Sequence, residues 1–106
     1  MQVRFSRRAV RDLEEIADYV ARDRPRAAMA LVGRLRKAAS DIAYGPLAHP
    51  LWMDLPDLGL RKRVSGPYLI FYRVERDTVF IARIVHGSRN IRAIFTADLS
   101  PPDAPS

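Results

Sequence analysis

The sequence predicts an α+β domain in which an N-terminal strand and an αα-hairpin pack on a small antiparallel sheet. Residues 68–74 and 78–85 are rich in β-branched and aromatic residues and are separated by a short polar break, as in a β-hairpin. Both faces of these two segments are apolar, so other elements must cover them. Upstream, two amphipathic stretches joined by a short link predict a pair of antiparallel helices.

The chain is predicted to begin with a short strand and a helix. Residues 2–5 form the strand, which joins the sheet beside one of the later strands. Ser6 is a predicted N-cap, because its hydroxyl can accept a hydrogen bond from an early backbone amide. Apolar residues at helical spacing then predict a helix over residues 7–21. Charged residues are expected mostly on its opposite, solvent-facing side: Arg7, Arg8, Arg11, Asp12, Glu14, Glu15 and Asp18.

A second helix is predicted to begin at Pro25, since proline suits the first position of a helix. Its apolar residues form a seam at spacings of three and four as far as Ile42. Gly45 and Pro46 are expected to end it, with glycine at a position that tolerates a left-handed conformation. The apolar sides of both helices should pack on the sheet, and this core is expected to bury Leu13, Ile16, Leu31, Leu35, Ile70 and Ile81.

The second half of the chain is predicted to be a loop followed by three consecutive strands. Residues 47–59 contain proline and glycine, but their apolar content indicates packing, with Trp52 as an anchor. Short turns favour antiparallel pairing of the strands. Simple alternation along residues 78–85 places one set on one face, Val79, Ile81 and Val85, and the other set on the opposite face, Phe80, Ala82 and Ile84.

Length and composition bound the class of protein. The 106 residues suit one domain, which is expected to span residues 1–99, and the proline- and serine-rich residues 100–106 are expected to be a disordered tail. No apolar run of about 18 residues and no signal-peptide pattern is present. The chain has no cysteine, which excludes disulfides and thiolate chemistry. We therefore expect a cytoplasmic protein without a membrane partner.

The charge balance suggests an acidic partner. The net charge is +6, from 18 basic and 12 acidic residues, which favours nucleic acid or an acidic protein segment. His49 and His86 lack ligand-spaced partners, so no metal is expected. No phosphate-binding loop, nucleophile elbow or zinc-protease helix is present, and no cofactor is expected.

A basic cluster with one histidine in the second half of the chain has two interpretations. Cleavage of RNA through the ribose 2′-hydroxyl needs a base, an acid and positive charge, which four residues could supply: His86, Arg61, Lys62 and Arg89. In the other interpretation no residue is catalytic and the chain binds an acidic partner. The partner-binding residues would then be five arginines and three exposed apolar loop residues: Arg61, Arg63, Arg73, Arg83, Arg89, Leu51, Trp52 and Leu55.

Three segments of the chain resemble the ParE branch of the RelE/ParE toxin superfamily, from bacterial toxin–antitoxin modules. They are residues 5–20, residues 60–74 and residues 84–90, where His-Gly-Ser-Arg-Asn stands in place of the typical His-Gly-x-Arg-Asp. The resemblance covers about residues 2–95 and implies a helical hairpin on a small antiparallel sheet. It implies a toxin that a cognate antitoxin holds inactive. For the ParE branch it also implies DNA gyrase as the target, inhibited by binding.

The RelE branch implies a different activity, the cleavage of messenger RNA on the ribosome. This sequence departs from that branch at two positions. Leu69 stands where RelE-like nucleases carry an arginine, and Phe95 stands where they carry a tyrosine that takes part in cleavage. Neither side chain can transfer a proton or hold a phosphate. The favoured interpretation is therefore gyrase inhibition; the alternatives are a ribosome-dependent endoribonuclease and an inactive antitoxin-binding homologue.

Overall fold

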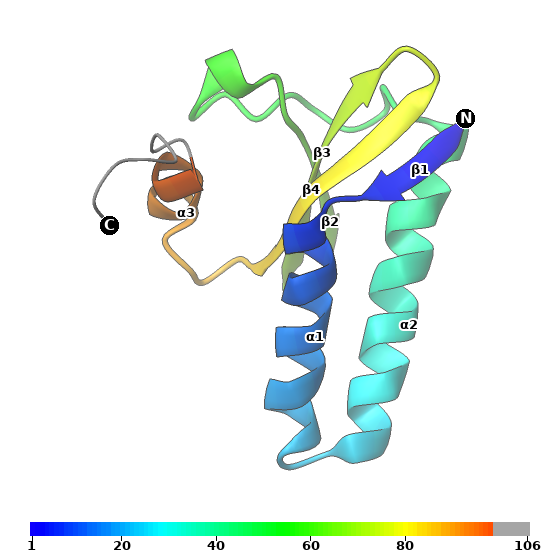
Figure 1. The fold of residues 1–106 in the computed structure, drawn as a ribbon, viewed down its shortest axis with the longest axis vertical. Helices are drawn as coiled ribbons and strands as arrows, with labels where there is room; N and C mark the ends of the chain where they lie inside the picture. Colours follow the sequence, from blue (N-terminus) through cyan, green and yellow to red (C-terminus); the bar gives the residue numbers. More distant parts are fainter. Residues whose placement is uncertain (99–106) are drawn as a thin grey trace.

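A helical hairpin and a four-stranded sheet form the body of the molecule (Figure 1). The computed structural model describes residues 1–98, so the predicted tail lies outside the described residues. The elements follow in the order β1 (Gln2–Phe5), α1 (Arg7–Ala21), α2 (Pro25–Asp41), η1 (Ile42–Tyr44), η2 (Pro56–Leu58), β2 (Arg61–Ser65), β3 (Tyr68–Glu75), β4 (Thr78–His86) and α3 (Ile91–Asp98). The predicted α+β class, strands and helical hairpin are confirmed, whereas α3 extends the chain beyond the predicted element order.

The sheet has the strand order β1-β4-β3-β2. β2, β3 and β4 pair antiparallel, as predicted, and the turns between them have two residues each. β1, however, pairs with β4 in parallel, from Gln2 opposite Thr78 to Phe5 opposite Ile81. The sheet is therefore mixed. The direction of β1 follows from the helical hairpin. Because α1 and α2 run in opposite directions, they return the chain to the end of the sheet where β1 began. β2 then runs in the same direction as β1, and the two turns bring β4 into that direction again.

β4 contains a bulge at Ala82, which has no partner on β3 because the pairing register shifts there by one residue. An extra residue in a strand reverses the alternation of the side chains that follow. Val79 and Ile81 face the helices together, but beyond the bulge Ile84 joins them and Val85 lies on the opposite face. The predicted alternation is therefore wrong after Ala82.

Each face of the sheet carries its own apolar core. The helical hairpin covers one face. Two of the predicted core residues, Ile16 and Leu31, are partly buried at the margin of this core, and the other four are fully buried: Leu13, Leu35, Ile70 and Ile81. The loop before β2 and the helix α3 cover the other face, where Trp52, Phe71 and Phe95 are buried. α3 lies apart from the hairpin in Figure 1, which fits its packing on this second face.

The start of α1 is predicted correctly from the sequence, whereas the backbone conformation at the end of α2 is not. Ser6 caps α1 as expected, with its Oγ accepting the backbone N–H of Ala9 at 3.0 Å. At the end of α2, the chain tightens into the single turn η1, and the N–H of Gly45 donates to the carbonyl of Ile42 at 3.1 Å. Gly45 ends this helical segment as expected, but its φ of −158° is extended, so the chain does not use the left-handed conformation that glycine tolerates.

Replacing Leu35 with alanine should lower the free energy of unfolding by about 2–5 kcal/mol, because the substitution leaves a cavity between α2 and the sheet. Leu47, which is 68% exposed, provides the matched control, and Leu47→Ala should change stability by less than about 0.5 kcal/mol. Urea unfolding followed by circular dichroism measures both variants. An unchanged midpoint for Leu35→Ala would mean that the hairpin does not pack on the sheet as described.

Candidate functional site

α1 lies along the edge of β4 beyond the point where β1 ends. β1 pairs with β4 as far as Ile81, and the carbonyl of the bulged Ala82 then accepts the hydroxyl of Ser6 at 2.8 Å. Further along the strand, Oδ2 of Asp12 accepts the backbone N–H of Ile84 at 2.9 Å. Two side chains from the start of α1 thus satisfy backbone groups that a longer β1 would otherwise pair.

Arg83 binds the Asp12 carboxylate from the interior of the molecule. Its Nε and Nη2 donate to the two carboxylate oxygens of Asp12 at 2.9 and 3.0 Å, and the Arg83 side chain is 4% exposed. This two-point pairing neutralises both buried charges and satisfies the carboxylate. The prediction of Arg83 as a surface residue that binds a partner is therefore wrong, as is the expectation that Asp12 faces solvent.

The cations of β2 point to both faces of the sheet, and backbone carbonyls hold two of them. Nη1 of Arg61 donates to the carbonyl of His49 at 2.7 Å, and Nη1 of Arg63 donates to that of Ala38, near the end of α2, also at 2.7 Å. Lys62 lies between them and faces the opposite side. Both arginines are half-buried, and they fasten the loop and α2 to the sheet. Burial, together with the charge of Arg63, lowers the pKa of His49.

The three loop residues predicted to be exposed have different environments. Leu51 is 49% exposed, and Leu55 is half-buried. Trp52 is 7% exposed, and its ring centroid lies 5.0 Å from that of Phe71 and 5.1 Å from that of Phe95. The interpretation of Trp52 as a packing anchor is confirmed, and the expectation that it offers an exposed surface is wrong. Arg73, by contrast, is exposed on β3.

The four residues considered for RNA cleavage do not come together. Arg61 begins β2, whereas His86 ends β4 on the far side of β3, level with Ser65 at the other end of β2. The four steps from Arg61 to Ser65 span about 13 Å, so Arg61 is remote from His86. Lys62 points to the opposite face of β2 from Arg61. Of this set, Arg89 lies near His86, in the turn that follows β4.

Ser88 fixes the orientation of the His86 ring. Nδ1 of His86 accepts the backbone N–H of Ser88 at 3.1 Å and lies 2.8 Å from the Ser88 hydroxyl. This pattern assigns the proton of the neutral imidazole to Nε2, which then donates and does not accept. The edge of the ring packs against Tyr68, with the centroids 5.2 Å apart. The arrangement suits donation of a hydrogen bond rather than abstraction of a proton.

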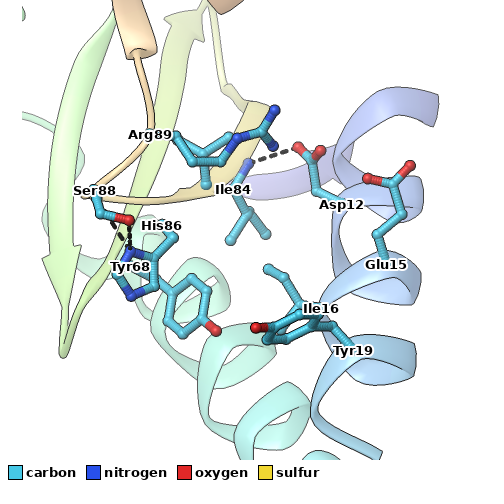
Figure 2. Close-up of a pocket in the computed structure, with 10 residues that line it drawn as sticks. Asp12, Glu15, Ile16, Tyr19, Tyr68, Ile84, His86, Ser88 and Arg89 are labelled. Atoms are coloured by element: carbon cyan, nitrogen blue, oxygen red, sulfur yellow. Dashed lines mark hydrogen bonds between the residues drawn. The ribbon is translucent and has the colours of Figure 1, made fainter. Parts of the chain in front are cut away.

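A pocket of about 410 Å³ opens between α1, the start of β3 and the end of β4 (Figure 2). We call it the α1–β4 pocket. Its apolar lining comes from Ile16, Ile84 and Val85. Its polar groups come from α1, from the start of β3, from the end of β4 and from the turn that follows: Asp12, Glu15, Tyr19, Tyr68, His86, Ser88 and Arg89. The pocket therefore combines an apolar floor with hydrogen-bonding groups, which is typical of a binding site.

Tyr68 brings an unpaired hydroxyl to the α1–β4 pocket. Its ring is part of the core and the residue is 9% exposed, yet its hydroxyl makes no hydrogen bond with another residue of the described range 1–98. Figure 2 shows this hydroxyl turned toward that of Tyr19 across the pocket. Burial, reinforced by Tyr19, raises the pKa of Tyr68. The Tyr68 hydroxyl therefore keeps its proton at neutral pH and can donate it to a ligand.

Sequence reasoning missed this pocket because the groups that form it were assigned elsewhere. Asp12 was expected on the solvent-facing side of the first helix, and Tyr68 on a purely apolar face. One signal was present in the sequence: Arg83 interrupts an apolar strand, and a buried guanidinium needs a carboxylate partner. The first amphipathic helix, which was expected to pack on the sheet, was the place to look for that carboxylate.

Within residues 1–98, a group of metal ligands or a helix that could cross a membrane would also indicate the class of site. No three side chains among histidine, aspartate and glutamate are grouped closely enough to hold a metal ion. No helix in this range has both the length and the apolar character needed to cross a membrane.

Solved structures with the same fold come from toxin–antitoxin systems. A chain of the chromosomal ParDE system from P. aeruginosa superposes with a TM-score of 0.72 at 21% identity, over 81% of this chain and 95% of that one. A chain of the RelBE2 toxin–antitoxin complex from Mycobacterium tuberculosis gives a TM-score of 0.56 at 30% identity, over 80% and 88% of the two chains. The fold is therefore that of the RelE/ParE toxins.

Sequence comparisons identify the family. Toxin RelE2 of Caulobacter vibrioides is 37% identical over 89 residues, which are 83% of this chain and 97% of the relative. A putative toxin of Sinorhizobium fredii, Y4kP, is 31% identical over 95 residues, covering 81% and 88%. The model of the ParE toxin of the type II toxin–antitoxin system parDE matches residues 3–91. The chain therefore belongs to the ParE toxin family, and the protein is a toxin of the type II toxin–antitoxin class.

Replacing Asp12 with asparagine leaves the buried charge of Arg83 uncompensated, so we expect a loss of about 3–5 kcal/mol of stability. Glu14→Gln makes the same change of charge at an exposed position of α1 and should cost less than about 0.5 kcal/mol. Thermal and urea unfolding compare the two variants with the parent protein. If Asp12→Asn were as stable as Glu14→Gln, the ion pair would contribute little to holding α1 against β4.

Proposed function

We propose that this toxin binds DNA gyrase and inhibits it without catalysing a reaction, and that a cognate antitoxin neutralises it. Membership of the ParE toxin family supports the proposal. The observation that carries it is the separation, within residues 1–98, of the side chains that cleavage would require. Arg61 and Lys62 lie on β2, at a distance from His86 and Arg89. Gyrase acts in the cytoplasm, so the proposal also requires a cytoplasmic toxin.

The chemistry of RNA cleavage supports this choice between the two targets. A general base must lie within hydrogen-bonding distance of the hydroxyl that it deprotonates, and positioned acid–base groups contribute about 10²–10⁴-fold to a rate. Nδ1 of His86 already accepts from Ser88. Phe95, where a nuclease of the RelE branch would carry a tyrosine, is 5% exposed and packs between Trp52 and Phe71. Inhibition by binding needs none of these groups, because a stable contact surface is sufficient.

The charge of the chain supports an acidic antitoxin. A protein with a net charge of +6 attracts an acidic partner over a distance of about a Debye length, which accelerates association at low ionic strength. The solved relatives include complexes of toxins with antitoxins. The antitoxin of this chain would be encoded beside the toxin gene.

Expression of the toxin without its antitoxin should stop DNA replication and induce the DNA-damage response, while messenger RNA stays intact at first. Purified toxin should inhibit the supercoiling activity of gyrase, since the proposed contact needs no other component. Mapping of mRNA ends and a supercoiling assay, carried out in parallel after induction, measure the two activities.

Codon-positioned cuts in ribosome-bound mRNA, with supercoiling unaffected, would overturn gyrase inhibition and support the ribosome-dependent endoribonuclease instead. His86, Arg61, Lys62 and Arg89 would then become the catalytic candidates. In that case His86→Gln should abolish the cuts, whereas a gyrase inhibitor makes none. A toxin that affects neither activity would indicate a homologue that retains only antitoxin binding.

A further inference from the structure

The α1–β4 pocket is lined along one side by residues of α1. The residues of α1 that line it are Asp12, Glu15, Ile16 and Tyr19, which recur at the spacing of one helical face. The seven residue steps from Asp12 to Tyr19 span roughly 10 Å, or about two turns. A pocket whose α1 side has this length, with Ile16 and Ile84 in its lining, suits the apolar face of a partner helix of about two turns.

The charges around the α1–β4 pocket leave one cation without a partner. The carboxylate of Asp12 pairs with Arg83, and that of Glu15 pairs with Arg8 at 3.1 Å. Arg89 is exposed at the rim and makes no ion pair within the described residues 1–98. Asp12 and Glu15, the two carboxylates that line the pocket, therefore have partners, whereas the guanidinium that lines it, that of Arg89, has none within residues 1–98. A ligand that carries a single negative charge would complete the set.

The unpaired hydroxyl of Tyr68 specifies the ligand further. The Tyr68 residue is nine-tenths buried, while its unpaired hydroxyl is reached by solvent at the pocket beside Ile16 and Ile84. The hydroxyl can therefore donate a hydrogen bond to an acceptor that enters with an apolar stem. A carboxylate has one charge and two acceptor oxygens, which suits one guanidinium and one hydroxyl. A phosphate dianion would need more cations than Arg89 provides.

We propose that the antitoxin inserts an amphipathic helix into the α1–β4 pocket, with apolar side chains against Ile16 and Ile84 and one aspartate or glutamate carboxylate bound by Tyr68 and Arg89. This inference rests on the proposed neutralisation by an antitoxin and assigns the contact to residues other than the loop before β2. A second copy of the chain is a poor occupant, because each copy carries a net charge of +6 and the copies repel one another.

The test is isothermal titration of the toxin with the antitoxin encoded by the adjacent gene. Tyr68→Phe removes only the hydroxyl and should weaken binding about 3–10-fold; Arg89→Gln removes the charge and should weaken it at least about tenfold. The matched controls are Tyr44→Phe, at a tyrosine that is 90% exposed, and Arg92→Gln, on the exposed side of α3. Neither residue lines the pocket, so both controls should bind within about twofold of the parent toxin.

The comparison between the matched variants decides the inference. Equal weakening by Arg89→Gln and Arg92→Gln would reveal general charge attraction and overturn the specific contact, as would unchanged binding in Tyr68→Phe and Arg89→Gln. Circular dichroism confirms that each variant is folded. The gyrase assay with parent toxin is independent: a toxin that leaves supercoiling unaffected overturns the proposed target, while the titration still decides the pocket.

Discussion

The contact between the Asp12 carboxylate and β4 determines where the helical hairpin lies, and most of the functional geometry depends on it. β1 contributes four residues and ends opposite Ile81, so β4 continues past its neighbour with unpaired backbone groups. Ser6 and Asp12 pair two of these groups. α1 therefore contacts the edge of β4 as well as the face of the sheet. The space between α1 and the end of β4 forms the α1–β4 pocket.

The arginines of the chain divide into structural and exposed groups, and this division shapes the functional interpretation. Arg83 is buried in an ion pair, and Arg61 and Arg63 bind carbonyl groups of the loop and of α2. These three residues stabilise the fold. Arg73 and Arg89 remain at the surface, where a partner can reach them. The net positive charge therefore favours an acidic partner without indicating which arginines contact it.

Features that depend on residues close together in the chain are predicted correctly from the sequence. Features that depend on contacts between distant residues are not. The limits of α1, the Ser6 cap and the core leucines follow from helical spacing and capping chemistry, which involve residues close in the chain. The bulge at Ala82 depends on how β3 and β4 pair, and the burial of Asp12 depends on a residue 71 positions away. The site was harder to predict than the fold, because the pocket is formed by segments whose proximity only the tertiary structure reveals.

The most direct test of this account is the rate of amide hydrogen exchange at Ile84, measured by NMR. If Asp12 replaces a strand at the edge of β4, the Ile84 amide should exchange at least about a hundredfold more slowly than that of Val64, which lies on the exposed edge of β2. Protection comparable to that of the central strands is the predicted result. An Ile84 amide that exchanges as fast as Val64 would contradict the account, because α1 would then not be held on the edge of β4 by this carboxylate.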